Sequence, residues 1–481
     1  MTAFDFHDMI VALPEVKLAA MSLALLLLAV VSKKENYRLV AWLAVAVLAV
    51  TGALVACGTH GTAFGDMFVS DAFSTYMKLV VVTGSAASLI MATRYLEHEK
   101  ASRIEYPVLI LFATLGMMLM ISANSLISLY MGLELQSLPL YVLAAIRRDS
   151  VRSTEAGLKY FVLGALSSGL FLYGASLVYG FTGSVDFTQM AGILQGHAST
   201  LPGIVTGMVL VLAALAFKIS AVPFHMWAPD VYEGAPTPVT AFFAIAPKVA
   251  AIALLTRVLT GPFWGMMQEW QQVIVVISMA SMLLGGVAAV AQTNIKRLLA
   301  YSSIGHMGYA LVGLAAASAA GVQAVIVYMT IYAVMSAGAF AVVLMMKKDG
   351  RMVEDISDLA GLGKAQPLLA FAMSVLMFSM AGIPPLAGFF GKLFVFQAAV
   401  AEGLYTLALV GVLTSVVAAF YYIRIVKVMY FDEPKKAGFD ATEDRGLKFV
   451  LALSTFAVMF FIVMPAPVLA SAHAAALALI P

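Results

Sequence analysis

Fourteen apolar stretches, each about 20 residues long, follow one another along the chain and leave no room for a soluble domain between them. A stretch of this length crosses a hydrocarbon core about 30 Å thick as a helix. Only 11% of the residues are charged, against about 25% in ordinary soluble domains. The sequence therefore predicts an all-α polytopic membrane protein, with helices at roughly 12–31, 39–57, 72–93, 106–122, 125–146, 154–180, 203–225, 238–260, 272–291, 298–317, 322–346, 368–400, 403–430 and 447–470.

The rest of the composition excludes several classes of function. The net charge of +2 is small and the basic residues are scattered, so we expect no nucleic-acid partner. The single cysteine, Cys57, can form neither an internal disulfide nor a cysteine-ligated iron–sulfur site. No His, Cys and acidic residues have the spacing of metal ligands. The N-terminus is acidic where a signal peptide would be basic, so we expect the first helix to be retained.

Lysine and arginine residues gather in alternate loops, as they do on the cytoplasmic side of membrane proteins. We therefore expect a multi-pass protein of a bacterial inner membrane, in contact with lipid and with both termini on the periplasmic side. One cytoplasmic loop departs from the pattern, because the segment after Pro223 has no basic residue and instead contains Asp230 and Glu233. The alternate loops and their flanks hold 21 of the 28 basic residues: Lys33, Lys34, Arg38, Arg94, Lys100, Arg103, Arg147, Arg148, Arg152, Lys296, Arg297, Lys347, Lys348, Arg351, Lys364, Arg424, Lys427, Lys435, Lys436, Arg445 and Lys448.

The seven remaining basic residues lie within the apolar stretches and differ in depth. Lys17 and Arg257 lie near helix ends, where long side chains usually reach the membrane surface, and Lys78 is structural or undecided. Four lysines lie deeper or in more unusual surroundings: Lys159, Lys218, Lys248 and Lys392.

One carboxylate, Glu134, lies near the middle of an apolar stretch. Burial and nearby charges shift the pKa values of lysine and glutamate in opposite directions, so moving one partner moves a proton. Glu134 and the four lysines therefore favour a proton relay. The alternative is a static buried ion pair that only specifies helix packing.

Two of the predicted helices are broken by proline. Pro223 follows Lys218, and Pro384 and Pro385 precede Lys392. Breaks at corresponding places in two halves indicate a transport site. Since the segments FKISAVPF and FSMAGIPP resemble each other, we interpret helices 4–8 and 9–13 as inverted five-helix repeats. The chain then divides into 1–105 with three helices, 106–260 and 261–430 with one repeat each, and 431–481 with a loop and helix 14.

Two histidines are secondary candidates. His225 follows the first break, and His306 lies in the tenth stretch among Tyr301, Ser302 and Ser303. Either could carry protons or simply form hydrogen bonds between helices.

Several motifs together resemble the antiporter-like subunits of proton-pumping NADH:quinone oxidoreductase, respiratory complex I. They are YMGLELQSLPLYVLAA, EAGLKYFVLGALSSG, FKISAVPFHMWAPDVYEGAPTPVTAFFA, QTNIKRLLAYSSIGHMGY and AGIPPLAGFFGKL. The chain is most similar to the N-type subunits, the counterparts of mitochondrial subunit 2. A lysine in helix 12 and the lack of a long lateral helix favour this type.

The resemblance implies a role for each candidate residue. Glu134 and Lys218 match the charge pair of the family, Lys248 its central lysine, Lys392 the residue toward the outer exit, and Lys159 a lysine near the pair. It also implies proton movement from cytoplasm to periplasm, driven by quinone reduction in partner subunits that hold the flavin, the iron–sulfur clusters and the quinone. This chain would bind no cofactor or metal and would neighbour paralogous membrane-arm subunits. A subunit of a sodium/proton antiporter and a non-conducting scaffold are the alternatives.

Overall fold

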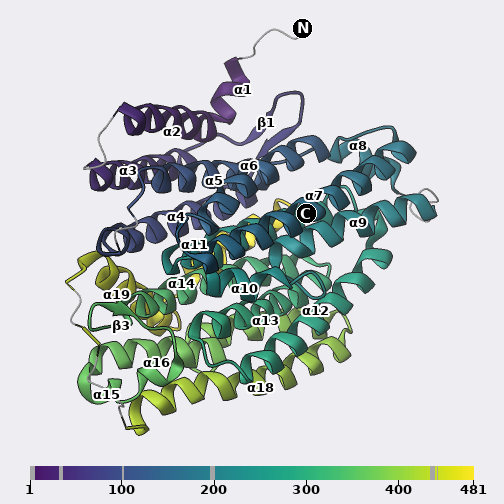
Figure 1. Cartoon of the computed structure of the whole chain (residues 1–481). Coiled ribbons are helices and arrows are strands. Elements are labelled where there is room, and N and C mark those ends of the chain that lie inside the picture. The colour runs from purple at the N-terminus through teal and green to yellow at the C-terminus, as the bar shows by residue number, and fades with distance from the viewer. Residues whose placement is uncertain are drawn as a thin grey trace.

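The computed structural model describes residues 6–31, 36–99, 102–195, 201–433, 439–440 and 443–480. The described chain is a bundle of helices, most of which lie roughly side by side and run across the view of Figure 1. Five of the lysines expected on the cytoplasmic side lie outside the described residues: Lys33, Lys34, Lys100, Lys435 and Lys436.

The N-terminal part packs against the rest of the bundle through its third long helix. Asp71 and Ser74 begin that helix with reciprocal side-chain to backbone hydrogen bonds, which satisfy amide groups that the first turn leaves free. A short antiparallel hairpin, which the sequence did not predict, precedes it. The elements are α1 (Phe6–Val11), α2 (Leu13–Val31), α3 (Tyr37–Ala56), β1 (Gly61–Ala63), β2 (Phe68–Ser70) and α4 (Ala72–His98).

The next segment contains the first predicted repeat. Its fourth predicted helix ends at Ile219, and a separate short helix follows the break. The elements are α5 (Glu105–Ile121), α6 (Leu126–Ala144), α7 (Val151–Thr182), α8 (Phe187–Ile193), α9 (Pro202–Ile219), α10 (Trp227–Gly234) and α11 (Thr237–Thr260).

The second predicted repeat is also broken in its fourth helix, between α16 and α17. A second two-stranded hairpin, again not predicted, follows α14. The elements are the 3-10 helix η3 (Trp264–Met266), α12 (Met267–Val290), α13 (Ile295–Ala315), α14 (Ala319–Met345), β3 (Lys347–Lys348), β4 (Arg351–Met352), η4 (Ile356–Leu359), α15 (Leu362–Ala365), α16 (Pro367–Ala381), α17 (Ala387–Ala401) and α18 (Tyr405–Phe431).

The prediction of one continuous helix over 447–470 is wrong. This stretch forms α19 (Arg445–Phe460) and α20 (Ala466–Leu477), and the break carries Pro465 as the N-cap of α20. Proline lacks an amide hydrogen and its ring clashes with the preceding turn, so it begins helices more readily than it continues them.

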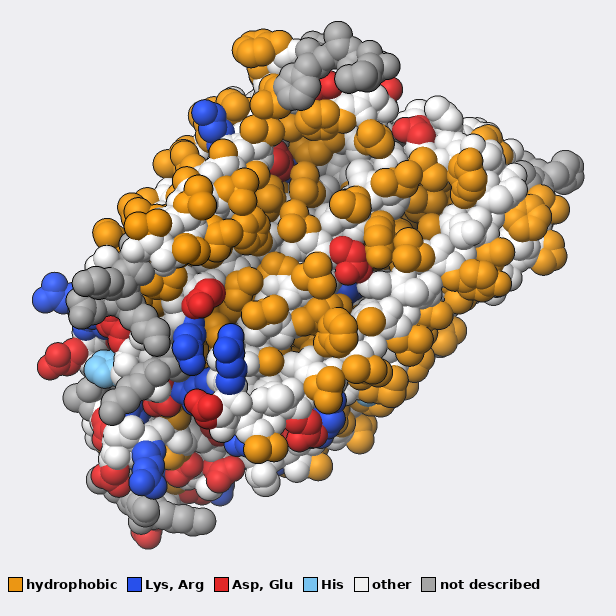
Figure 2. Space-filling view, turned by 45° about the horizontal axis from the view of Figure 1, so that its top comes forward, with side chains coloured by type: hydrophobic (Ala, Val, Ile, Leu, Met, Phe, Trp, Pro, Cys, Tyr) orange, Lys and Arg blue, Asp and Glu red, His pale blue; other side chains and the backbone are white. Residues whose placement is uncertain are grey.

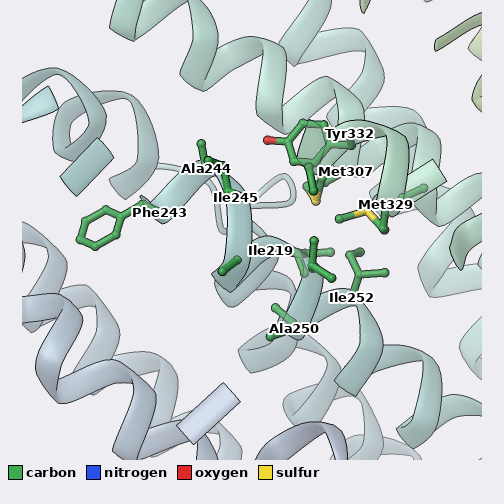
Figure 3. Close-up of a cluster of buried hydrophobic side chains, with 14 of the residues drawn as sticks. Ile219, Phe243, Ala244, Ile245, Ala250, Ile252, Met307, Met329 and Tyr332 are labelled. Atoms are coloured by element: carbon green, nitrogen blue, oxygen red, sulfur yellow. The ribbon is translucent and has the colours of Figure 1, made fainter. Parts of the chain in front are cut away.

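The centre of the bundle is formed by α11, α13 and α14. Every residue of α11 is buried, whereas α2, α7 and α18 expose many large apolar side chains. Figure 3 shows part of this core, where side chains of α11 such as Ile245 and Ile252 lie near Met307 and Met329 of α13 and α14. The exposed apolar side chains cover much of the surface seen in Figure 2. This distribution is that of a protein that faces lipid or other apolar chains.

The predicted fold class is confirmed. Eleven helices of the described part are long and apolar enough to cross a membrane by themselves. Charged side chains gather at one end of the surface in Figure 2, the end at which β3, α15 and α19 lie in Figure 1. The number of membrane crossings, the inverted repeats and the domain limits stay predictions.

Candidate functional site

The first helix break exposes the carbonyl groups of the end of α9. Ser220 adopts the left-handed conformation with φ of 59°, and its amide donates to the Phe217 carbonyl at 3.0 Å. The next amide, of Ala221, donates to the Ala216 carbonyl at 2.8 Å. This pattern ends a helix and turns the chain away from its axis. The peptide bond between Val222 and Pro223 is cis.

The second break repeats this geometry at the end of α16. Gly382 has φ of 87°, and its amide donates to the Ser379 carbonyl at 2.9 Å. The amide of Ile383 donates to the Phe378 carbonyl at 3.0 Å, and the bond between Pro384 and Pro385 is cis. Ser220 therefore corresponds to Gly382. A direct alignment of FKISAVPF with FSMAGIPP would instead pair Ser220 with Ala381, which lies one position before Gly382.

Lys248, from the middle of α11, binds the first break. Its Nζ donates to the Ile219 carbonyl at 2.9 Å and to the Ser220 hydroxyl, and lies 5.2 Å from the centre of the Trp227 ring. Lys248 is 1% exposed. The last carbonyls of a helix lack partners within the helix and carry partial negative charge, so they stabilise a buried ammonium group.

Lys392, in α17, binds the second break in the same way. Its Nζ donates to the Ala381 carbonyl at 2.9 Å and to the Ser415 hydroxyl at 2.8 Å. The Tyr309 ring lies 4.8 Å away. Each lysine therefore binds the carbonyl of the residue just before the left-handed one. That residue is Ile219 before Ser220 for Lys248, and Ala381 before Gly382 for Lys392.

The predicted Glu134 and Lys218 pair makes no ion pair within 4.0 Å in the described structure, and each of the two side chains is hydrogen-bonded to a different serine. Lys218 donates from Nζ to the Ser137 hydroxyl at 2.7 Å. Ser137 lies about one turn from Glu134 on α6, and the Glu134 carboxylate accepts a hydrogen bond from Ser168 of α7. Lys218 also follows directly on Phe217, whose carbonyl begins the first break. Lys248 therefore binds the carbonyl of the residue that follows Lys218, while the Lys218 side chain bonds α6.

His306 lies at the centre of a buried polar cluster. Its Nδ1 is 2.7 Å from the Tyr328 hydroxyl, and its Nε2 is 3.0 Å from the Tyr422 hydroxyl. Ser302 is also bonded to Tyr422 at 2.5 Å. Lys392 and His306 line one small cavity with Tyr309. The cavity therefore places hydroxyl and imidazole groups, which can exchange protons, beside Lys392.

Lys159 and His225 do not join these groups. The Lys159 side chain is 41% exposed, and its Nζ contacts Asp230 at 2.8 Å and Glu155 at 2.8 Å. His225 is half-buried in the turn after Pro223, and its Nδ1 has no hydrogen-bond partner among the described residues. Lys159 is thus a surface residue on α7, about two and a half turns from Ser168.

The expectation that Arg257 reaches the membrane surface is wrong. Its guanidinium is 7% exposed and binds both oxygens of Asp71 at 2.9 Å, together with the Ile121 carbonyl at 2.8 Å. A charge near a helix end stays buried when another element supplies a carboxylate there. Lys17, by contrast, is exposed.

Two further buried ion pairs each contain a residue that the sequence analysis did not single out as a buried charge, Glu15 and Lys296. Lys78 pairs with Glu15 at 2.6 Å, and both side chains are at most 4% exposed. Lys296 pairs with Glu354 at 3.0 Å, and its side chain is 2% exposed. Glu15 lies at the start of its helix and Lys296 adjoins a basic loop, so their positions in the sequence did not indicate that they are buried.

Comparison with known proteins shows to which family this chain belongs. Residues 123–418 match the family model described as NADH:quinone oxidoreductase/Mrp antiporter, TM. The chain belongs to this family. The match contains both helix breaks and all of Glu134, Lys218, Lys248 and Lys392.

Relatives in this family are similar over nearly the whole chain. NADH-quinone oxidoreductase subunit N of Paramagnetospirillum magneticum is 56% identical over 98% of each chain. Subunit N 1 of Rhizobium meliloti is 56% identical over 97% of each. These identities confirm the resemblance seen in the sequence motifs.

Solved structures of the family share the fold. A chain of respiratory complex I from Thermus thermophilus superposes with a TM-score of 0.82 at 33% identity, over 96% of this chain and 99% of its own. A chain of the Mrp complex from Dietzia has a TM-score of 0.80 at 24% identity, over 98% and 96%. At this lower identity the likeness concerns the fold alone.

Proposed function

We propose that the chain is the N-type subunit in the membrane arm of a bacterial NADH:quinone oxidoreductase and moves protons from cytoplasm to periplasm. The observation that carries the proposal is the pair of helix breaks, each of which holds a buried lysine ammonium on the same carbonyl position. Full-length similarity to proteins named subunit N assigns the complex in which this device works.

The lysines act by gaining and losing one proton each. A lysine ammonium donates three hydrogen bonds and a neutral lysine accepts one, so loss of a proton changes what Nζ can bind. Lys248 binds the carbonyl of Ile219, the residue that follows Lys218, so a change of charge at one lysine alters the field at the other. Glu134 stabilises the protonated form of Lys218 from a distance.

Lys392 and the His306 cluster continue this series in the second half of the chain. The breaks supply fixed carbonyl dipoles at each lysine. In this proposal the flavin, the iron–sulfur clusters and the quinone belong to partner subunits, and this chain performs no redox step. Both termini lie on the periplasmic side, and paralogous membrane-arm subunits are its neighbours.

Isolation of the native assembly tests the proposal. The tagged chain is extracted mildly from its own membrane and the assembly is assayed for NADH:quinone reductase activity, with absorbance of flavin and iron–sulfur clusters. The proposal predicts that all three accompany the chain. If the assembly lacks these cofactors and exchanges sodium for protons, the chain is an antiporter subunit and the proposal is wrong. If the assembly conducts no ion, the chain is a structural scaffold.

A further inference from the structure

A polar cavity of about 780 Å³ opens at the end of the molecule where charged side chains gather. It lies between the end of α4, the start of α7, the turn from α10 to α11, the start of α13 and the segment around β4. Its wall includes Glu99, Arg147, Arg152, Glu233, Lys296 and Glu354. The basic loops place this end on the cytoplasmic side.

Lys296 is the buried charge in this wall. Its Nζ donates to the carbonyls of Glu233 at 2.9 Å and Ala235 at 2.8 Å and to the Glu354 carboxylate at 3.0 Å. These acceptors account for all three protons of the ammonium. Glu233 and Ala235 lie at the end of α10, so Lys296 joins the second part of the broken helix to α13.

An unbroken chain of ion pairs leads to Lys296 across the cytoplasmic end. Asp230 and Glu233, the two acids in the loop without basic residues, are both members of this chain, and each binds Arg297 at 2.9 Å. The chain therefore explains why that loop is acidic. In order it runs Lys159, Asp230, Arg297, Glu233, Arg152, Glu354 and Lys296, with distances between 2.8 and 3.5 Å.

Polar groups continue from Lys296 into the bundle. Ser303 and His306 lie seven and ten residues after Lys296 on α13, which places all three on one face of the helix over about 15 Å. The Ser303 hydroxyl is 2.8 Å from that of Tyr332. His306 is bonded to Tyr328, and the Tyr309 ring lies 6.2 Å from the His306 ring and 4.8 Å from Lys392 Nζ.

We propose that the cavity is the cytoplasmic inlet for protons and that Lys296 is the group that passes them inward. This inference rests on the proposed function. One Nζ–H bond of Lys296 breaks and its proton moves toward the Ser303 and Tyr332 hydroxyls through water. The neutral amine then takes one proton from the cavity, which restores the ammonium. Glu354 is a positioning residue that holds the ammonium at the wall.

Replacement of Lys296 by arginine tests whether Lys296 transfers protons or only holds the helices together. Arginine keeps the charge and can bond the same carboxylate and carbonyls, but it does not lose its proton in proteins. Because positioned proton donors contribute about 10²–10⁴-fold, we expect Lys296→Arg to lower proton pumping and coupled quinone reduction at least about tenfold in vesicles of the whole complex. Lys348→Arg is the matched control, since Lys348 also bonds an acid and a carbonyl, both of Asp358, and should keep both rates.

Chemical closure of the cavity gives a second, independent test. In a Cys57→Ser background, Thr293→Cys places a thiol on the cavity wall and Asp149→Cys an exposed thiol at the same end. A membrane-impermeant thiol reagent, added to inside-out vesicles, should slow pumping after labelling at 293 and leave it unchanged after labelling at 149.

Lys248→Ala, measured in parallel, separates the two proposals. If it stops pumping while Lys296→Arg and the labelled Thr293→Cys variant both pump at full rate, the inlet is overturned and the proposed function stands. If Lys248→Ala also pumps at full rate, the proposed function itself fails.

Discussion

Buried ammonium groups in this protein fall into two kinds, set by their acceptors. Lys248 and Lys392 bind carbonyl and hydroxyl oxygens and no carboxylate, so each can become neutral without leaving a buried anion behind. Lys78 is held by the Glu15 carboxylate, which is only 3% exposed, so loss of a proton would strand a buried charge; the Glu354 carboxylate that holds Lys296 is 23% exposed on the cavity wall and does not carry this cost. The first kind suits proton transfer and the second suits structure.

Replacing Glu15 tests the structural kind. Glu15→Gln leaves the Lys78 ammonium buried without a charged partner, so we expect a loss of about 3–5 kcal/mol of stability. The double variant Glu15→Gln with Lys78→Met removes both charges and should recover most of it. Thermal unfolding of the solubilised complex measures both changes. Lys17→Gln, at an exposed position near Glu15, is the control; equal melting of Glu15→Gln and this control would contradict the account.

The Glu354 carboxyl gives a pH dependence with a defined sign. Burial raises its pKa, but Lys296, Asn294 and Arg152 together hold the pKa below its ordinary value. A depressed folded-state pKa contributes stability that is present above the unfolded pKa, about 4.3 for glutamate, and lost as pH falls through the folded value.

The stability difference between wild type and Glu354→Gln should therefore stay constant from about pH 8 to pH 5.5 and shrink only below about pH 4. Thermal unfolding across this range measures it. A difference that instead disappears between pH 8 and 6 would mean that the carboxyl titrates near neutrality and is not held by Lys296.

At the scale of elements, each break is a helix end that a left-handed residue turns toward a lysine. Gly382 has φ of 87°, and a Cβ placed there would lie 3.0 Å from Cδ and 3.3 Å from Nζ of Lys392. The absence of a side chain thus both permits the turn and leaves space for the ammonium.

Replacing Gly382 by alanine should show whether the position of Lys392 matters for activity in addition to the backbone strain of the turn. Gly382→Ala puts a Cβ into a left-handed residue, at a cost of about 1–2 kcal/mol, and displaces Lys392. Gly403→Ala is the matched control, because Gly403 has φ of 74° and a Cβ there would meet nothing within 4 Å. We expect similar losses of stability in both variants but slower coupled quinone reduction only in Gly382→Ala. Equal rates in the two would show that Lys392 does not depend on this turn.

At the scale of the whole molecule, the sequence predicted what depends on composition and spacing. Runs of apolar residues gave the helices, and prolines in two of them gave the breaks beside Lys218 and Lys392. The break at Pro465 was missed, although proline marks it too, because the apolar run continues across it. The hairpins at β1 and β3 were missed because each strand has only two or three residues.

The sequence could not predict which charged side chains form ion pairs with each other. Arg257 and Asp71 are far apart in the chain, and so are Lys78 and Glu15, and each pair forms only through packing between helices. For the same reason the sequence analysis assigned Lys296 to a loop. The family resemblance implied that Lys159 lies near the Glu134 and Lys218 pair, whereas its Nζ contacts Asp230 and Glu155. The inverted repeats stay a prediction, which the shared geometry of the two breaks supports. The number of membrane crossings stays a prediction as well.

The most direct test of the account is proton pumping by the complex with Lys248→Arg. Arginine keeps a positive charge at the first break but does not exchange its proton. With Lys17→Arg as control, the account predicts that pumping and coupled quinone reduction fall at least about tenfold, while NADH oxidation by ferricyanide shows that the complex is assembled. Full pumping by Lys248→Arg would contradict it, because the lysine would then serve only to hold the helices together.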